Sequence, residues 1–80
     1  MESVRRLVRR YEPGGELIGE AALDGVPLSA LQAIFRGPPS DPMYDCWRIR
    51  AERLPALAPY LTAPVVLDRF SYYVEADAAT

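Results

Sequence analysis

The sequence predicts a small α+β domain with a mainly antiparallel four-stranded sheet and two short helices on one face. Four short segments have the composition or alternation of strands, and two others carry apolar residues at helical spacing. Eight prolines in 80 residues divide the chain into short elements and exclude long helices. The elements follow the order β-β-α-β-α-β, and a chain of this length forms one domain, residues 1–80.

The first two strands are expected to form a hairpin. Residues 3–11, SVRRLVRRY, are rich in β-branched and aromatic side chains, and residues 16–23 return after a Pro-Gly-Gly turn. Arginines fall on both faces of the first segment, so we expect it at or near a sheet edge, with the arginine stems on apolar surface. Arginines there can face glutamates of the second strand, and each such pair contributes about 0.2–1 kcal/mol.

A short helix is expected after the turn at Asp24-Gly25. Ser29 and Gln32 have the spacing of a capping box, in which each side chain bonds to the backbone N–H of the other. The apolar stripe that follows consists of Leu31, Ile34 and Phe35. Gly37 stands at the usual terminating position, before two prolines. A helix of two to three turns is marginal alone, so it must pack on the sheet.

Residues 43–50 read as a third strand, but their alternation leaves open which face turns inward. Each face combines apolar residues with one charged residue: Tyr44, Cys46 and Arg48 on one, Asp45, Trp47 and Ile49 on the other.

The remaining two elements are a short helix and the most regular strand. Residues 51–61 predict the helix, with Pro55 in its first turn and Pro59 limiting it to about two turns. Residues 70–76, FSYYVEA, alternate with period two. We expect Tyr72 in the core and Tyr73 exposed.

The residue types that usually carry catalysis or bind metal are scarce. There is no His, which removes the commonest general base and metal ligand, and a single Cys excludes ordinary zinc sites. Asp41 and Asp45 supply too few oxygens for calcium and read as turn or solvated carboxylates. Cys46 has no base beside it in the sequence and is expected to be buried and inert. The sequence therefore predicts a protein that is not an enzyme and has no metal or cofactor.

Nucleic-acid binding is the alternative that the first strand suggests. The local basic run consists of Arg5, Arg6, Arg9 and Arg10. The chain as a whole has a net charge of −2, however, and its aromatic residues are not interleaved with the run as on an RNA-binding sheet. A strand whose arginines pair with glutamates is the interpretation that we favour.

Two segments resemble the motifs of a known family. Residues 41–49, DPMYDCWRI, resemble D-P-M-Y-D-C-[aromatic], and residues 67–75, LDRFSYYVE, are similar to L-D-[RK]-[aromatic]-x-Y-[aromatic]-x-[DE]. The family consists of small, stand-alone bacterial proteins without a known function, and its members look like immunity proteins encoded beside toxin genes. The resemblance implies binding to a toxin domain. The basic first strand departs from the usual acidity of the family.

These observations predict a cytoplasmic, non-enzymatic protein-binding module, plausible as an immunity protein that neutralises a bacterial toxin domain. No signal peptide or transmembrane run is expected. The alternative is a nucleic-acid-binding accessory protein that uses the arginine run, and a homodimer through edge strands is a further possibility. The residues predicted to contact a protein partner are Asp41, Asp45, Trp47, Asp68, Tyr73 and Glu75.

Overall fold

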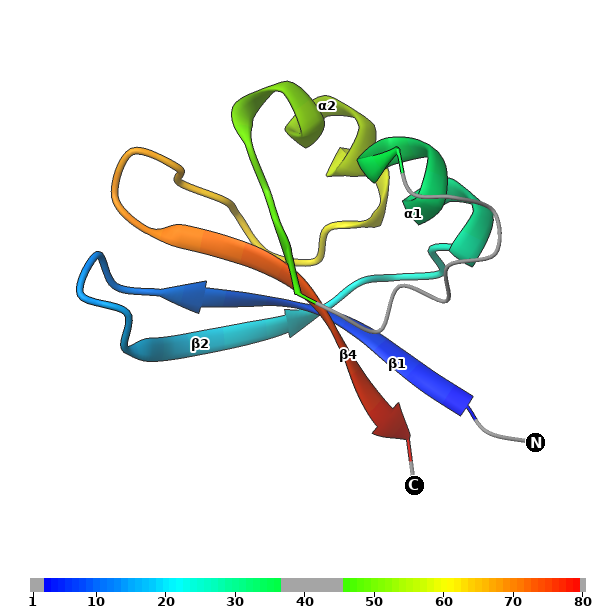
Figure 1. Ribbon diagram of the computed structural model, residues 1–80, viewed down its shortest axis with the longest axis horizontal. Helices are drawn as coiled ribbons and strands as arrows, with labels where there is room; N and C mark the ends of the chain where they lie inside the picture. The colour runs from blue at the N-terminus through cyan, green and yellow to red at the C-terminus, as the bar shows by residue number, and fades with distance from the viewer. Residues whose placement is uncertain (1–2, 37–45, 80) are drawn as a thin grey trace.

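The computed structural model describes residues 3–36 and 46–79 and contains an antiparallel sheet under two short helices (Figure 1). The strands are β1 (Ser3–Tyr11), β2 (Leu17–Ala22), β3 (Trp47–Arg48) and β4 (Ser71–Ala79). They lie in the order β2-β1-β4-β3, and every neighbouring pair is antiparallel. The predicted fold class is confirmed. No helix in the described part of the chain is long and apolar enough to cross a membrane.

The first strand lies near the edge of the sheet, as predicted, but it is not the edge strand itself. β1 lies inside the sheet, with β2 on one side and β4 on the other. An arginine-rich strand is stable there because carboxylates of both neighbouring strands pair with Arg9. The expected cross-strand pairing is confirmed at Arg9, which lies opposite Glu20 in the register of the hairpin.

The first helix, α1 (Leu28–Phe35), begins two residues earlier and ends one residue earlier than its sequence signals suggest. Pro27 is the N-cap, and its carbonyl accepts the N–H groups of Ala30 and Leu31, so Ser29 lies inside the first turn and the predicted capping box is wrong. At the other end Arg36 takes the left-handed conformation, with φ 56°, that was expected of Gly37. Gly37 itself lies outside the described residues.

The second helical segment is divided into three short pieces. A 3₁₀ turn, η1 (Ala51–Arg53), leads into α2 (Leu54–Leu57), and a second 3₁₀ turn, η2 (Ala58–Tyr60), follows. Pro55 lies in the first turn of α2 and Pro59 in the first turn of η2. Both prolines therefore occupy positions where a missing N–H costs no helical hydrogen bond.

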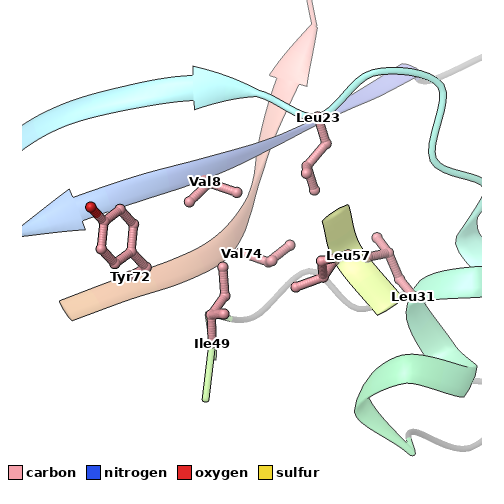
Figure 2. Close-up of a cluster of buried hydrophobic side chains, with 7 residues drawn as sticks. All are labelled: Val8, Leu23, Leu31, Ile49, Leu57, Tyr72 and Val74. Carbon is pink, nitrogen blue, oxygen red and sulfur yellow. The ribbon is translucent and has the colours of Figure 1, made fainter. Parts of the chain in front are cut away.

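The core lies between the helices and one face of the sheet (Figure 2). Its buried members are Val8, Leu23, Leu31, Ile49, Leu57, Tyr72 and Val74. Leu31, Ile49 and Leu57 are fully buried and fasten α1, the end of β3 and α2 to the sheet. Because α1 and α2 both lie on this face, no helix of the described chain covers the other one (Figure 1).

The tertiary structure also decides the phase of the third strand. Trp47 pairs with Val74 and Arg48 with Tyr73, so Trp47 shares the core face with Val74. Ile49 is 2% exposed, and its N–H donates to the carbonyl of Tyr72. Residues 43–45 of the predicted strand lie outside the described residues.

Candidate functional site

The face of the sheet away from the helices carries a network of charged side chains centred on Arg9. We call this the open face; its β1 residues are Arg5, Leu7, Arg9 and Tyr11. All three guanidinium nitrogens of Arg9 bind carboxylates on neighbouring strands. Nε lies 3.0 Å from Glu20, Nη1 lies 2.7 Å from Glu75 and Nη2 lies 2.9 Å from Asp77. One cation thus ties β2, β1 and β4 together across the sheet.

Strand alternation and register bring these groups together. Arg9 lies opposite Glu20 on β2 and opposite Tyr73 on β4, while Glu75 and Asp77 follow at intervals of two on the same face. To reach Asp77, the Arg9 side chain passes over Leu7, which pairs with Glu75 in the register. This accounts for the 3% exposure of Leu7 on a face that no described helix covers.

Glu75 is the buried member of the network, at 8% exposure. One carboxylate oxygen accepts from Arg9, and the other accepts from the Tyr11 hydroxyl at 2.5 Å. Burial alone would raise the pKa of Glu75. The hydrogen bonds from Tyr11 and Arg9, the positive charge of Arg9 and a hydrogen bond from Cys46 outweigh burial and lower this pKa below its usual value. Glu75 is therefore charged at neutral pH.

The same contacts shift the pKa values of the two donors. Donation to the charged Glu75 raises the pKa of Tyr11 to about 12, with burial adding to the effect. Hydrogen bonds to Glu75 and Glu20 raise the pKa of Arg9 still further above the range in which it could lose its proton. At neutral pH Glu75 and Arg9 therefore stay charged and Tyr11 stays protonated, which suits a positioning role better than proton transfer.

An open depression of about 530 Å³ lies beside this network, at the hairpin end of the open face. The rings of Tyr11 and Tyr73 meet edge to face, with centroids 5.5 Å apart. Exposed Arg48 stands on the rim, and half-exposed Leu17 lies opposite Tyr11 in the hairpin register. The residues that line the depression are Tyr11, Glu12, Pro13, Gly15, Cys46, Arg48, Ser71, Tyr73 and Glu75.

Two of the six residues predicted to contact a partner lie at this depression. Tyr73 is half-buried in its wall, and Glu75 lies in its lining as a structural carboxylate with both oxygens occupied. Trp47 lies on the core face and packs against Phe35, with ring centroids 5.9 Å apart. Asp68 is exposed in the turn before β4 and does not line the depression. Asp41 and Asp45 lie outside the described residues.

The arginine run of the first strand is divided between the two faces of the sheet. Arg5 and Arg9 lie on the open face, and Arg9 is paired with three acids. Arg6 and Arg10 have the opposite parity, and the Arg10 guanidinium lies 5.0 Å from the centre of the Phe70 ring. A single phosphate-binding track formed by all four side chains is not compatible with this alternation.

Seven of the nine residues that line the depression were not predicted as partner-binding, and Tyr11, Cys46 and Arg48 are the most informative of them. The prediction that Cys46 is buried is wrong, since it is exposed. Cys46 and Arg48 share the parity of the open face, and only the phase of β3 shows this. For Tyr11 the signal was present, because it shares its strand face with Arg9. Within residues 3–36 and 46–79, no set of three His, Cys, Asp or Glu side chains is placed to hold a metal ion.

Comparison with known proteins adds a family assignment. Residues 5–75 match the family described as a domain of unknown function, DUF7683. The chain belongs to this family. The predicted membership of a small, uncharacterised family is thereby confirmed, and the match includes the Arg9 network as far as Glu75. A search of curated proteins gave no match to this DUF7683 domain.

Proposed function

We propose that this DUF7683 domain is a non-enzymatic protein-binding module whose contact surface is the depression beside Tyr73. The observation that carries the proposal is the grouping of Tyr11, Tyr73 and Arg48 around this depression, with exposed Leu17 next to Tyr11. Tyrosine and arginine are enriched among the residues that dominate binding energy at protein interfaces.

The side chains around the depression are held in place before any partner binds, which supports the same proposal. Arg9 and Glu75 hold the lining of the depression in one arrangement through charge-assisted hydrogen bonds. Tyr11 is held by its bond to Glu75 and by its contact with the Tyr73 ring. Binding to side chains that are already ordered loses less conformational entropy, so a small surface can give useful affinity.

The chemistry of the same residues supports a role without catalysis. Glu75, the most buried acid here, has both oxygens occupied and a lowered pKa, so it is a poor general base. The Tyr11 hydroxyl, with its raised pKa, is a poor nucleophile at neutral pH. The sequence has no His that could activate Cys46.

In its narrower form, the proposal is that the partner is a bacterial toxin domain with a basic surface and that this chain is its cytoplasmic immunity protein. The resemblance of residues 41–49 and 67–75 to immunity-type proteins supports this form. The net charge of −2 favours a basic partner, although a charge this small accelerates association only modestly. A homodimer formed by pairing of edge strands stays a prediction, which light scattering can test.

The test is binding of the purified domain to the product of the adjacent gene, measured by calorimetry with three variants. Tyr73→Ala and Arg48→Ala should each weaken binding at least about tenfold, because they remove a tyrosine and an arginine side chain at the depression. Asp68→Ala is the matched surface control and should leave affinity nearly unchanged, because Asp68 does not line the depression.

Growth of cells that express both genes tests the narrower form separately. The two depression variants should lose protection against the adjacent gene product while remaining folded. Unchanged affinity in both depression variants would overturn the proposed surface. Absence of any complex, together with no rescue of growth, would overturn the toxin partner.

A further inference from the structure

A second cavity, of about 170 Å³, lies on the core face of the sheet, away from the depression beside Tyr73. It lies between the hairpin strands β1 and β2 and the segment that follows η2. Its apolar walls are formed by Val8, Ala21, Leu61, Pro64 and Val65. One positively charged side chain, Arg10, also lines it.

Small residues on the edge strand create the space for this cavity. Gly19 lies opposite Arg10 and Ala21 lies opposite Val8, so no large side chain of β2 covers this part of β1. A Cβ atom on Gly19 would lie 3.2 Å from Nη2 of Arg10, which means that the guanidinium lies close against the backbone of β2. The Phe70 ring, 5.0 Å away, adds a cation–π contact. Gly19 and Phe70 thus hold Arg10 in place at the cavity.

Arg10 differs from Arg9 in its partners. Arg9 binds three carboxylates, whereas Arg10 has no ion pair with any described residue. Its Nε atom is buried and has no hydrogen-bond partner in the described chain. Glu20 also lines the cavity, but its carboxylate turns to the open face and binds Arg9. A guanidinium in a partly apolar setting without a counter-charge favours a carboxylate, which its planar fork binds with two parallel hydrogen bonds.

We propose that this cavity binds a small carboxylic acid in its anionic form. The carboxylate lies against Arg10, and the apolar body of the ligand lies against Val8, Leu61 and Val65. A cavity of about 150 Å³ in another protein admits benzene, so the ligand has roughly six to nine non-hydrogen atoms, as in benzoate or a short branched fatty acid. For a ligand of this size we expect a dissociation constant of about 0.1–1 mM.

The experiment is a titration of the isotope-labelled domain with benzoate, followed by heteronuclear NMR. Amide signals of Val8, Gly19, Ala21 and Leu61 should shift and saturate. Benzamide has nearly the same shape but no charge, and should bind at least about tenfold more weakly. Isobutyrate should shift the same signals, and 2-naphthoate, which exceeds the cavity, should not.

Three variants test whether Arg10 and the space beside Ala21 are needed for benzoate binding. Arg10→Gln should weaken benzoate binding at least about tenfold. Ala21→Leu should fill the cavity and abolish binding while the signals of the folded domain remain. Arg5→Gln is the matched control, because Arg5 is an exposed arginine on the opposite face of the same strand. The affinity of this variant for benzoate should stay within about twofold of that of the unaltered domain.

Three results would each overturn the proposal: no saturable shifts with benzoate or isobutyrate, equal affinity for benzamide and benzoate, or shifts centred on Tyr73 instead of Val8. The comparison of benzoate with benzamide uses the unaltered domain, so the test stands even if Arg10→Gln does not fold. The outcome is independent of the protein-binding proposal, because Arg10 and Tyr73 lie on different faces.

Discussion

Replacing Arg9 by Met is the most informative perturbation of this fold. The side chain of Met follows the stem of Arg9 over Leu7 but lacks the guanidinium. The substitution leaves Glu75 with only 10% of its side chain exposed and without its cationic partner. Glu20 and Asp77 also lose their bonds to Arg9, but their side chains are 49% and 41% exposed and can be hydrated.

These exposed fractions determine how much Arg9→Met should lower the free energy of unfolding. Removing one partner of a fully buried ion pair costs about 3–5 kcal/mol. Arg9 is 20% exposed, which reduces this figure, and each of the two solvated pairs adds only about 0–1 kcal/mol. We therefore expect Arg9→Met to lower the free energy of unfolding by about 2–4 kcal/mol. The free energy of unfolding of an 80-residue domain is about 4–12 kcal/mol, so the loss is a large fraction of its stability.

Urea denaturation followed by circular dichroism measures this loss, and the thermal midpoint should fall by about 10–30 °C. Arg5→Met is the control, because Arg5 is 57% exposed and has one ion pair at 3.8 Å; its effect should stay within about 0.5 kcal/mol. The double variant Arg9→Met, Glu75→Gln should lose less than the sum of the single variants, because no buried charge remains unpaired. Equal losses for Arg9→Met and Arg5→Met, or a loss below about 1 kcal/mol for Arg9→Met, would refute this reasoning.

Three further predictions follow from the same structure. Because the folded pKa of Glu75 lies below its usual value of 4.5, its contribution to stability is complete above that value and is lost as the pH falls through the folded pKa; Glu75→Gln should flatten the acid limb of the urea-derived stability profile. The pKa of Tyr11 is raised from 10.0 to about 12, so its contribution to stability disappears as the pH rises through this interval. Tyr11→Phe should remove that alkaline loss from the urea-derived stability profile. Leu31→Ala, at a position with 0% exposure, should cost about 2–5 kcal/mol in chemical denaturation, whereas Leu28→Ala, at 39%, should cost less than about 1 kcal/mol. Equal costs for the two leucines would contradict the assigned core.

The order and type of the elements follow from the sequence because they depend on local signals. The Pro-Gly-Gly turn joins the hairpin strands, and Pro55 and Pro59 limit the second helical segment, as predicted. The ends of α1 were less predictable. Pro27 and Arg36 cap it in place of Ser29 and Gly37, because a helix can begin without a side-chain cap and a residue other than glycine can take the left-handed conformation at a modest cost.

The candidate site depended on contacts between residues far apart in the chain. Period-two alternation places Arg9 and Tyr11 on one face of β1, but Glu75 and Tyr73 are more than 60 residues away. Which acids meet Arg9 depends on strand order and register. An arginine-rich strand is expected at or near an edge when its partners are unknown. The structure places it one strand in from the edge, where acids of both neighbouring strands pair with Arg9.

The sequence by itself determined the fold class, the element order and the scarcity of catalytic residue types, because turns, alternation and composition are local properties. Only the tertiary structure decided that β1 is internal, that Trp47 packs in the core and that Cys46 reaches the surface. The physical reason is the pairing of β3 with β4. When both faces of a strand carry apolar and charged residues, the local sequence does not decide which face turns inward. A shift of one residue in the pairing would exchange all inward and outward side chains.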